Sequence, residues 1–289
     1  MPIQKIAFST RFARREKENE NFYVVIAKGT ILSLLDILLT LAVGTFAFFM
    51  LIGYIVSPIE RGFYCDDKSI TKPLKPHTIT PLHLILATLC VPLFTVFICE
   101  GIYFSRFRNQ TLSLRKYFAS STGIYLAYLL TFSVATLMME MAKCAFGRLR
   151  PHFLEACKPD WSLIDCTTDP TAFIADAHCT NEARMVRTGR GSFPSGHSEG
   201  AVLAFMFLYF YLTELVAVCK TSDLLPKIRA VVLVLFGIWA VVCCATRVTD
   251  CWHHPTDVLG GVTLGFLSIY IPFGRTTRTY AFDSQLLAP

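Results

Sequence analysis

Six long apolar runs restrict what this 289-residue chain can fold into. A helix needs about 20 mostly apolar residues to cross a bilayer, and 17% charged residues is far below the roughly 25% of a soluble domain. The sequence therefore predicts an all-α, polytopic membrane protein with six transmembrane helices. The runs lie at Ile31 to Val56, Pro81 to Phe104, Tyr117 to Ala142, Ser198 to Val218, Ile228 to Ala245 and Val258 to Phe273.

The sequence argues against a nucleic-acid-binding protein and against a cleaved signal peptide. The net charge of +6 is modest and the basic residues are scattered, so no nucleic-acid partner is expected. The first apolar run is too long for a signal-peptide core and no small-residue cleavage site follows it, so we expect a retained anchor. The chain then forms a single six-span domain, residues 1–289.

Basic residues beside the apolar runs predict the orientation, because Lys and Arg collect on the cytosolic side of membrane proteins. They cluster in residues 1–30 and in the loop after the second run, which has no acidic residue. These segments and the tail, residues 275–289, should be cytosolic. Residues 143–197 should form a lumenal or extracellular loop. The sequon at Asn109 falls in a loop predicted to be cytosolic, and we interpret it as a chance match.

Five cysteines fall in loops assigned to the lumenal or extracellular side, where disulfides can form. The pairing cannot be deduced from the sequence. These cysteines are Cys65, Cys157, Cys166, Cys179 and Cys251.

The first polar segment at a span end runs from Lys143 to Pro151. Seven residues at about 100° each return to within about 20° of the start, so Lys143 and Arg150 should project from one helical face, while Arg148, about 140° from Lys143, should point elsewhere. Two cations on one face suit an anionic ligand. They could equally be basic residues that extend toward the lipid boundary.

The second segment, Pro194-Ser195-Gly196-His197, stands directly before an apolar run. Pro, Ser and Gly there indicate a helix N-terminus, whose free amides and positive dipole end can bind phosphate. The alternative is an ordinary capped helix with a histidine at the membrane interface.

The third segment contains Arg247, His253, His254 and Asp257. Asp257 lies one helical turn beyond His253, so its carboxylate could hold the Nδ1 proton and leave Nε2 free to attack. His254 is an alternative partner for Asp257. The predicted topology brings all three segments to one outer face of the membrane, which is the expected position of an active site.

Together the segments resemble the type 2 phosphatidic acid phosphatase superfamily. Its signature is Lys-x6-Arg-Pro, then Pro-Ser-Gly-His, then Arg-x5-His-x3-Asp, and the six-span pattern is similar to the lipid phosphate phosphatase branch. The chain departs from the family at Thr246, which replaces a usual Ser, and at Pro255, where eukaryotic relatives usually carry Trp.

The resemblance implies a metal-independent lipid phosphate phosphatase that works through a phosphohistidine and needs no cofactor. Implied substrates are phosphatidate, lysophosphatidate, sphingosine 1-phosphate and ceramide 1-phosphate. His253 would be the nucleophile, Asp257 its orienting group and His197 the general acid. The implied phosphate-binding residues are Lys143, Arg150, Ser195, Gly196 and Arg247.

The family resemblance and the apolar runs together also indicate the cellular location. We expect a multi-pass protein of the plasma membrane, endoplasmic reticulum or Golgi, surrounded by membrane lipids, and a homo-oligomer is compatible with this arrangement. The remaining histidines are interpreted as surface or interfacial residues. These are His77, His83, His152 and His178.

Three alternative functions stay open. Cys144 and Arg150 have the spacing of cysteine-dependent phosphatases, although a thiol at the outgoing end of a helix would meet a negative dipole. A non-catalytic lipid-phosphate binding or scaffold protein should have lost a histidine or Asp257. A relative that acts on sugar phosphates or transfers head groups would carry the same signature.

The orientation can be tested with cysteine labelling in sealed membranes. We expect Gln110→Cys to react only after the membrane is opened, and Thr171→Cys to react from outside in intact vesicles, because the basic loops stay cytosolic. The unsubstituted chain provides the background from its own cysteines. External labelling at position 110 would reverse the predicted topology.

Overall fold

The computed structural model describes residues 22–106, 114–219 and 222–271. The segments 1–21 and 275–289 and the sequon at Asn109 lie outside the described residues. The expectations made for them stay predictions.

The fold is mostly helical. Five helices in the described part of the chain are long and apolar enough to cross a membrane: α2 (Phe22–Leu51), α3 (Pro81–Arg106), α4 (Leu114–Phe146), α7 (Gly196–Val218) and α8 (Leu224–Thr249). Helix α9 (Pro255–Ile269) has 15 residues, about 22 Å at 1.5 Å per residue, against a hydrocarbon core of about 30 Å. A multi-pass membrane protein is confirmed, and the sixth span stays a prediction.

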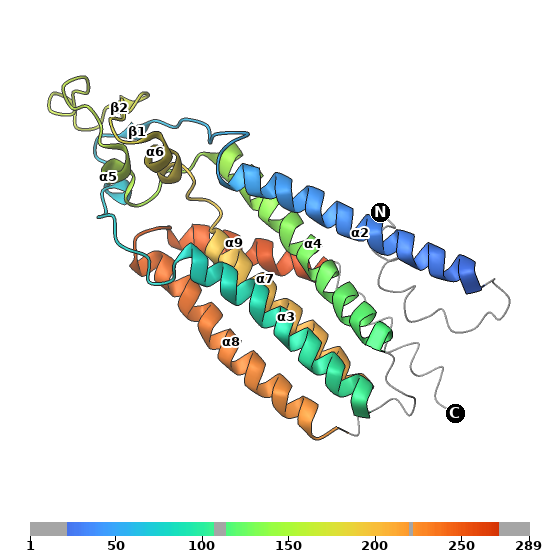
Figure 1. The fold of residues 1–289 in the computed structure, drawn as a ribbon. Coiled ribbons are helices and arrows are strands. Elements are labelled where there is room, and N and C mark those ends of the chain that lie inside the picture. The colour runs from blue at the N-terminus through green and yellow to red at the C-terminus, as the bar shows by residue number, and fades with distance from the viewer. Residues whose placement is uncertain (1–21, 107–113, 220–221, 272–289) are drawn as a thin grey trace.

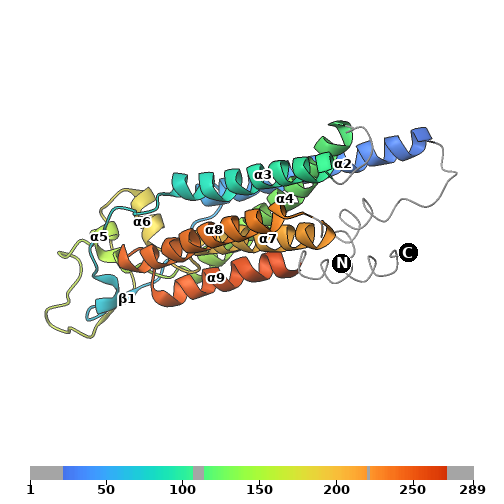
Figure 2. The same ribbon diagram turned by 90° about the horizontal axis from the view of Figure 1, so that it is seen from below.

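Helix α7 is the centre of the bundle. It contacts α3, α4, α8 and α9, and α2 packs along α4 (Figures 1 and 2). Tyr128 of α4 and Phe207 of α7 are fully buried between these helices, with ring centroids 4.4 Å apart. Apolar side chains such as Leu38 on α2 and Val241 on α8 are exposed instead. Exposed apolar faces on long helices are what a lipid environment requires.

Two glycines let α9 approach α7 closely. A Cβ atom at Gly261 would collide with the carbonyl oxygen of Ser195, and one at Gly265 would collide with that of Glu199. Small residues four apart are a common device for close packing of membrane helices. This contact sets the beginning of α9 beside the beginning of α7.

A small lobe covers one end of the bundle, where α2, α4 and α8 end and α3, α7 and α9 begin (Figure 1). It contains the short helices α5 (Phe153–Cys157) and α6 (Ala183–Gly189) and the 3-10 helix η1 (Lys68–Ile70). Strands β1 (Phe63–Tyr64) and β2 (Phe173–Ile174) pair antiparallel. This two-residue pair departs from an all-α fold, and it joins the loop between α2 and α3 to residues 143–197.

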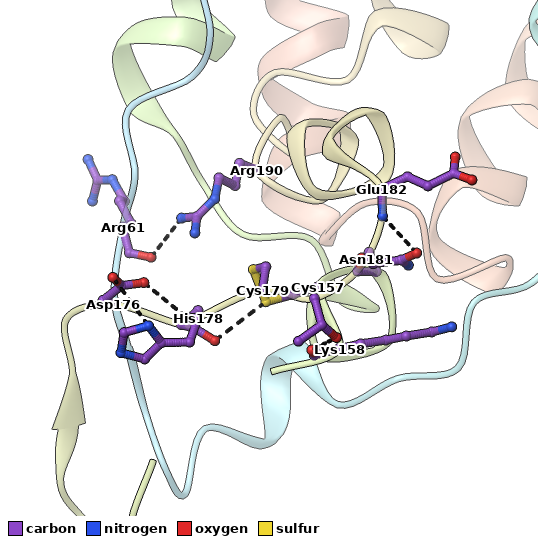
Figure 3. Close-up of a disulfide and its surroundings, with 12 residues drawn as sticks. Arg61, Cys157, Lys158, Asp176, His178, Cys179, Asn181, Glu182 and Arg190 are labelled. Atoms are coloured by element: carbon purple, nitrogen blue, oxygen red, sulfur yellow. Dashed lines mark hydrogen bonds and ion pairs between the residues drawn. A yellow bond between two sulfur atoms is a disulfide. The ribbon is translucent and has the colours of Figure 1, made fainter. Parts of the chain in front are cut away.

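Disulfides cross-link the lobe. Cys65 bonds Cys166 and Cys157 bonds Cys179, while Cys251 is free. Figure 3 shows the second bond. The pairing that the sequence left open is thus Cys65–Cys166 and Cys157–Cys179.

The α7–α9 contact predicts the effect of adding one methyl group. Gly261→Ala should lower the thermal midpoint of the detergent-solubilised protein, because the added Cβ forces α9 away from the backbone of α7. Gly101→Ala on α3 is the control, since its Cβ would meet only Tyr117 at an ordinary 3.7 Å and alanine favours a helix by about 0.5–1 kcal/mol. Equal midpoints for the two variants would contradict the close-packing account.

Candidate active site

His253 lies in the turn between α8 and α9, and the turn itself fixes its backbone. The amide of His253 donates to the carbonyl of Arg247 at 3.0 Å. The imidazole is 4% exposed, and its Nδ1 lies 2.6 Å from the carbonyl oxygen of Ser192. A carbonyl can only accept, so Nδ1 carries the hydrogen and Nε2 keeps its lone pair. Burial, assisted by the charges of Arg150 and Lys143, holds the pKa of His253 well below its usual value.

Asp257, in the first turn of α9, is completely buried and collects three hydrogen bonds. Its Oδ2 accepts from the Ser192 hydroxyl at 2.6 Å and from the His254 amide at 2.8 Å, and its Oδ1 pairs with Arg148 at 2.6 Å. The distance from Oδ2 to Nδ1 of His253 is 3.9 Å. Asp257 therefore does not hold the Nδ1 proton as the spacing suggested. It fixes Ser192, whose carbonyl does.

The helical-face argument for Lys143 and Arg150 is wrong. Helix α4 ends at Phe146, and Gly147 has a φ of +53°, a left-handed turn that ends the helix. Residues 147–150 are not helical. Arg148 is therefore not turned away from the site but pairs with Asp257 and also donates to Thr256 at 2.7 Å.

Arg150 is a buried cation without a carboxylate partner. Its Nη2 donates to the carbonyl of Gly191 at 3.1 Å, and its guanidinium lies over the Trp252 ring, 5.1 Å from the centroid. Its Nε has no partner, and among the described residues no carboxylate lies within ion-pair distance. Burial lowers the pKa of Arg150 to about 10, so the group stays charged near neutrality. A buried charge of this kind calls for an anion.

Arg247 and Lys143 add to the positive charge. Arg247 is completely buried, with an unpartnered Nε and one carboxylate, Asp250, at 3.4 Å. Lys143 pairs with Glu140 at 2.7 Å. A Cβ at Gly196 would lie 3.6 Å from the Lys143 amine, so this cation sits beside the beginning of α7.

The second segment begins α7 as the sequence indicated. Ser195 caps the helix and accepts from the amide of Ser198, and Gly196 is the first helical residue. The free amides and the positive dipole end of this 23-residue helix face the same region as the cations. His197, in the first turn, places its Nε2 3.1 Å from the carbonyl of Ile79.

Sequence reasoning missed three residues of this site. Ser192 bonds both His253 and Asp257, yet nothing in its local sequence marks it. His152, interpreted as a surface or interfacial residue, is completely buried with Nδ1 2.8 Å from the carbonyl of Cys251, and burial lowers its pKa to about 4. His77, interpreted in the same way, has its Nδ1 3.0 Å from Nη1 of Arg247. The position of His152 directly after the Arg-Pro pair was the one available signal.

The chain is similar to known proteins across most of its length. The model of the PAP2 superfamily matches residues 124–278, a range that contains all three polar segments. Phospholipid phosphatase 2 of Rattus norvegicus is 32% identical over 224 residues, which cover 76% of this chain and 77% of that protein. Phospholipid phosphatase 1 of Rattus norvegicus is 31% identical over 215 residues, covering 72% of each.

One solved structure is also similar. It is the crystal structure of the first transmembrane PAP2 type phosphatidylglycerolphosphate phosphatase from Bacillus subtilis. It is 22% identical to this chain, with a TM-score of 0.37, and the match covers 87% of this chain and 96% of that one.

The Arg148–Asp257 pair predicts a cost in stability. Arg148→Ala should destabilise the protein by roughly 1–2 kcal/mol: breaking a buried pair costs about 3–5 kcal/mol, but solvent screens a half-exposed guanidinium. Thermal unfolding in detergent measures the change. Arg184→Ala on α6 removes an exposed arginine and should leave the midpoint unchanged. Similar midpoints for the two variants would show that the pair contributes nothing.

Proposed function

Because the chain belongs to the PAP2 superfamily, we propose that it hydrolyses phosphate monoesters of lipids through a phosphohistidine and without a metal. The phospholipid phosphatase relatives support a phosphatase that acts on phospholipids. Proposed substrates are phosphatidate, lysophosphatidate, sphingosine 1-phosphate and ceramide 1-phosphate. The proposed membrane is the plasma membrane or an endomembrane, with the lobe end of the bundle outside or in the lumen.

The observation that carries the proposal is the buried Arg150 guanidinium without a carboxylate, beside His253. Hydrolysis of a phosphate monoester requires that negative charge on the equatorial oxygens be neutralised and that the nucleophile be held in line. Arg150 and Arg247 offer unpartnered Nε donors, and Lys143 adds charge at the N-terminus of α7. Fixed cations in a site that excludes water can supply this stabilisation.

The first step transfers the phosphoryl group to His253. The lone pair on Nε2 attacks phosphorus, so the new N–P bond forms as the P–O bond to the lipid breaks. The carbonyl of Ser192 holds the Nδ1 hydrogen and stabilises the charge that the ring gains. Protonated His197 gives its proton to the departing lipid alkoxide, which leaves as an alcohol.

The second step returns the enzyme to its starting state. His197, now neutral, takes a proton from a water molecule that attacks phosphorus, and the N–P bond breaks. Inorganic phosphate leaves and His253 recovers its Nε2 lone pair. Asp257 acts in both steps through Ser192, whose hydroxyl it binds.

An apolar surface beside the site favours lipid over sugar substrates. Phe146, the last residue of α4, is 49% exposed, and the centroid of its ring lies 5.1 Å from the ring centroid of Phe193. Phe193 directly follows Ser192, whose carbonyl holds His253. Acyl chains leaving the phosphate would meet these rings at the membrane, whereas a sugar would gain nothing from them.

The identity of the nucleophile can be tested by substitution. His253→Ala and His197→Ala should each lose at least about a hundredfold in turnover of lipid phosphates, the scale of removing a nucleophile or an acid–base group. Cys144→Ser is the matched control. Its thiol is buried and directed at the carbonyl of Val56, 3.8 Å away. If alkylating reagents abolish activity through Cys144, the cysteine mechanism replaces this one.

The metal-free site can be tested in excess EDTA. Phosphate release from the lipid panel should persist, glucose 6-phosphate should be a poor substrate, and vanadate should inhibit by resembling the phosphoryl transition state. Arg150→Ala should cost about 3 kcal/mol in transition-state stabilisation. Loss of activity in EDTA that magnesium restores would contradict metal independence.

A further inference from the structure

Residues 72–79 of the loop between α2 and α3, here called the strap, bind the residues that follow α8. The amide and hydroxyl of Thr78 donate to the two carboxylate oxygens of Asp250 at 2.8 and 3.0 Å. The indole of Trp252 donates to the carbonyl of Lys75 at 3.0 Å. The strap is therefore fixed against the turn that carries His253.

His77 projects from the strap to the proposed phosphate site. Its Nδ1 lies 3.0 Å from Nη1 of Arg247, and because a guanidinium can only donate, Nδ1 is the acceptor. The imidazole stacks on the Trp252 ring with centroids 3.8 Å apart and planes 19° apart. It also lies nearly parallel to the His197 ring, with centroids 5.9 Å apart and planes 12° apart.

The remaining contacts of Arg247 are longer. Its Nη2 donates to the hydroxyl of Thr246 at 3.2 Å and to Asp250 at 3.4 Å, and its Nε has no partner. Within the described part of the chain, His77 is the partner of Nη1 and makes the shortest bond to this guanidinium. The direction of the unpartnered Nε therefore depends on His77.

We propose that His77 is a positioning residue: its Nδ1 holds the Arg247 guanidinium in the orientation that binds phosphate, and Trp252 holds the imidazole. The inference rests on the proposed function, in which Arg247 binds the substrate phosphate. It assigns a role in the site to the loop between α2 and α3, far in sequence from the three polar segments.

The charge state of His77 suits this role. Burial, together with the charges of Arg247 and Arg150, lowers the pKa of His77 to about 4, against a smaller opposing effect of Asp250. The imidazole is therefore neutral near pH 7. It offers a lone pair to Arg247 without adding a positive charge beside it.

Three substitutions at His77 distinguish the effect of the hydrogen-bond acceptor from the effect of the stacked ring. His77→Asn places an amide oxygen near the position of Nδ1, His77→Gln places it one bond farther out, and His77→Phe keeps the stacked ring without an acceptor. His83→Asn, on the exposed side of α3, is the matched control. For each protein we would measure kcat and KM with a lipid phosphate and the affinity for vanadate by thermal shift.

We expect His77→Phe and His77→Gln to weaken vanadate binding and raise KM by about tenfold, the scale of a hydrogen bond to a charged group. His77→Asn should stay within about threefold of the unsubstituted protein, and His83→Asn should be unchanged. Full vanadate affinity in the Phe variant would overturn the proposal. An equal loss of vanadate affinity in the Asn and Gln variants would also overturn the proposal.

Two readouts keep the inference separate from the proposed function. If the Phe variant does not fold, the contrast between Asn and Gln still decides the matter. If the unsubstituted protein binds vanadate but releases no phosphate from lipids, the proposed function fails, while the order of vanadate affinities still tests His77.

Discussion

The carboxylate of Asp257 is the junction on which the site depends. It is completely buried at the beginning of α9, and its partners come from two other parts of the chain: Arg148 in the first polar segment, after α4, and Ser192, two residues before the second polar segment and α7. One charge thus joins three chain segments far apart in sequence. The same Ser192 presents its carbonyl to His253. The proposed nucleophile is oriented by these contacts together rather than by the carboxylate directly.

The helix bundle makes this junction possible. Gly261 and Gly265 let α9 lie against the backbone of α7, which brings Asp257 beside the capped end of that helix. The cations then accumulate at one end of the bundle, in part without balancing carboxylates. Arg150 is held by a carbonyl and the Trp252 ring and has no carboxylate at ion-pair distance among the described residues. We regard this imbalance as the physical basis of the proposed phosphate binding.

The sequence predicted those features that depend on neighbouring residues. Helix α7 begins at Gly196, as the Pro-Ser-Gly signal indicated. The helical-face prediction failed at Arg148, because it assumed that the helix continues past Phe146, whereas Gly147 ends it. That glycine was a signal present in the sequence. The contacts of Ser192 and His77 could not be predicted, because they join segments 61 and 170 residues apart.

The central claim is that His253 carries the phosphoryl group between the two steps. Rapid quenching of the protein during turnover of a lipid labelled in its phosphate measures this directly. We expect label on His253 that is lost in acid and kept in alkali, that appears before free phosphate and then decays. Label that persists in His253→Ala, or labelling of a cysteine instead, would contradict the account.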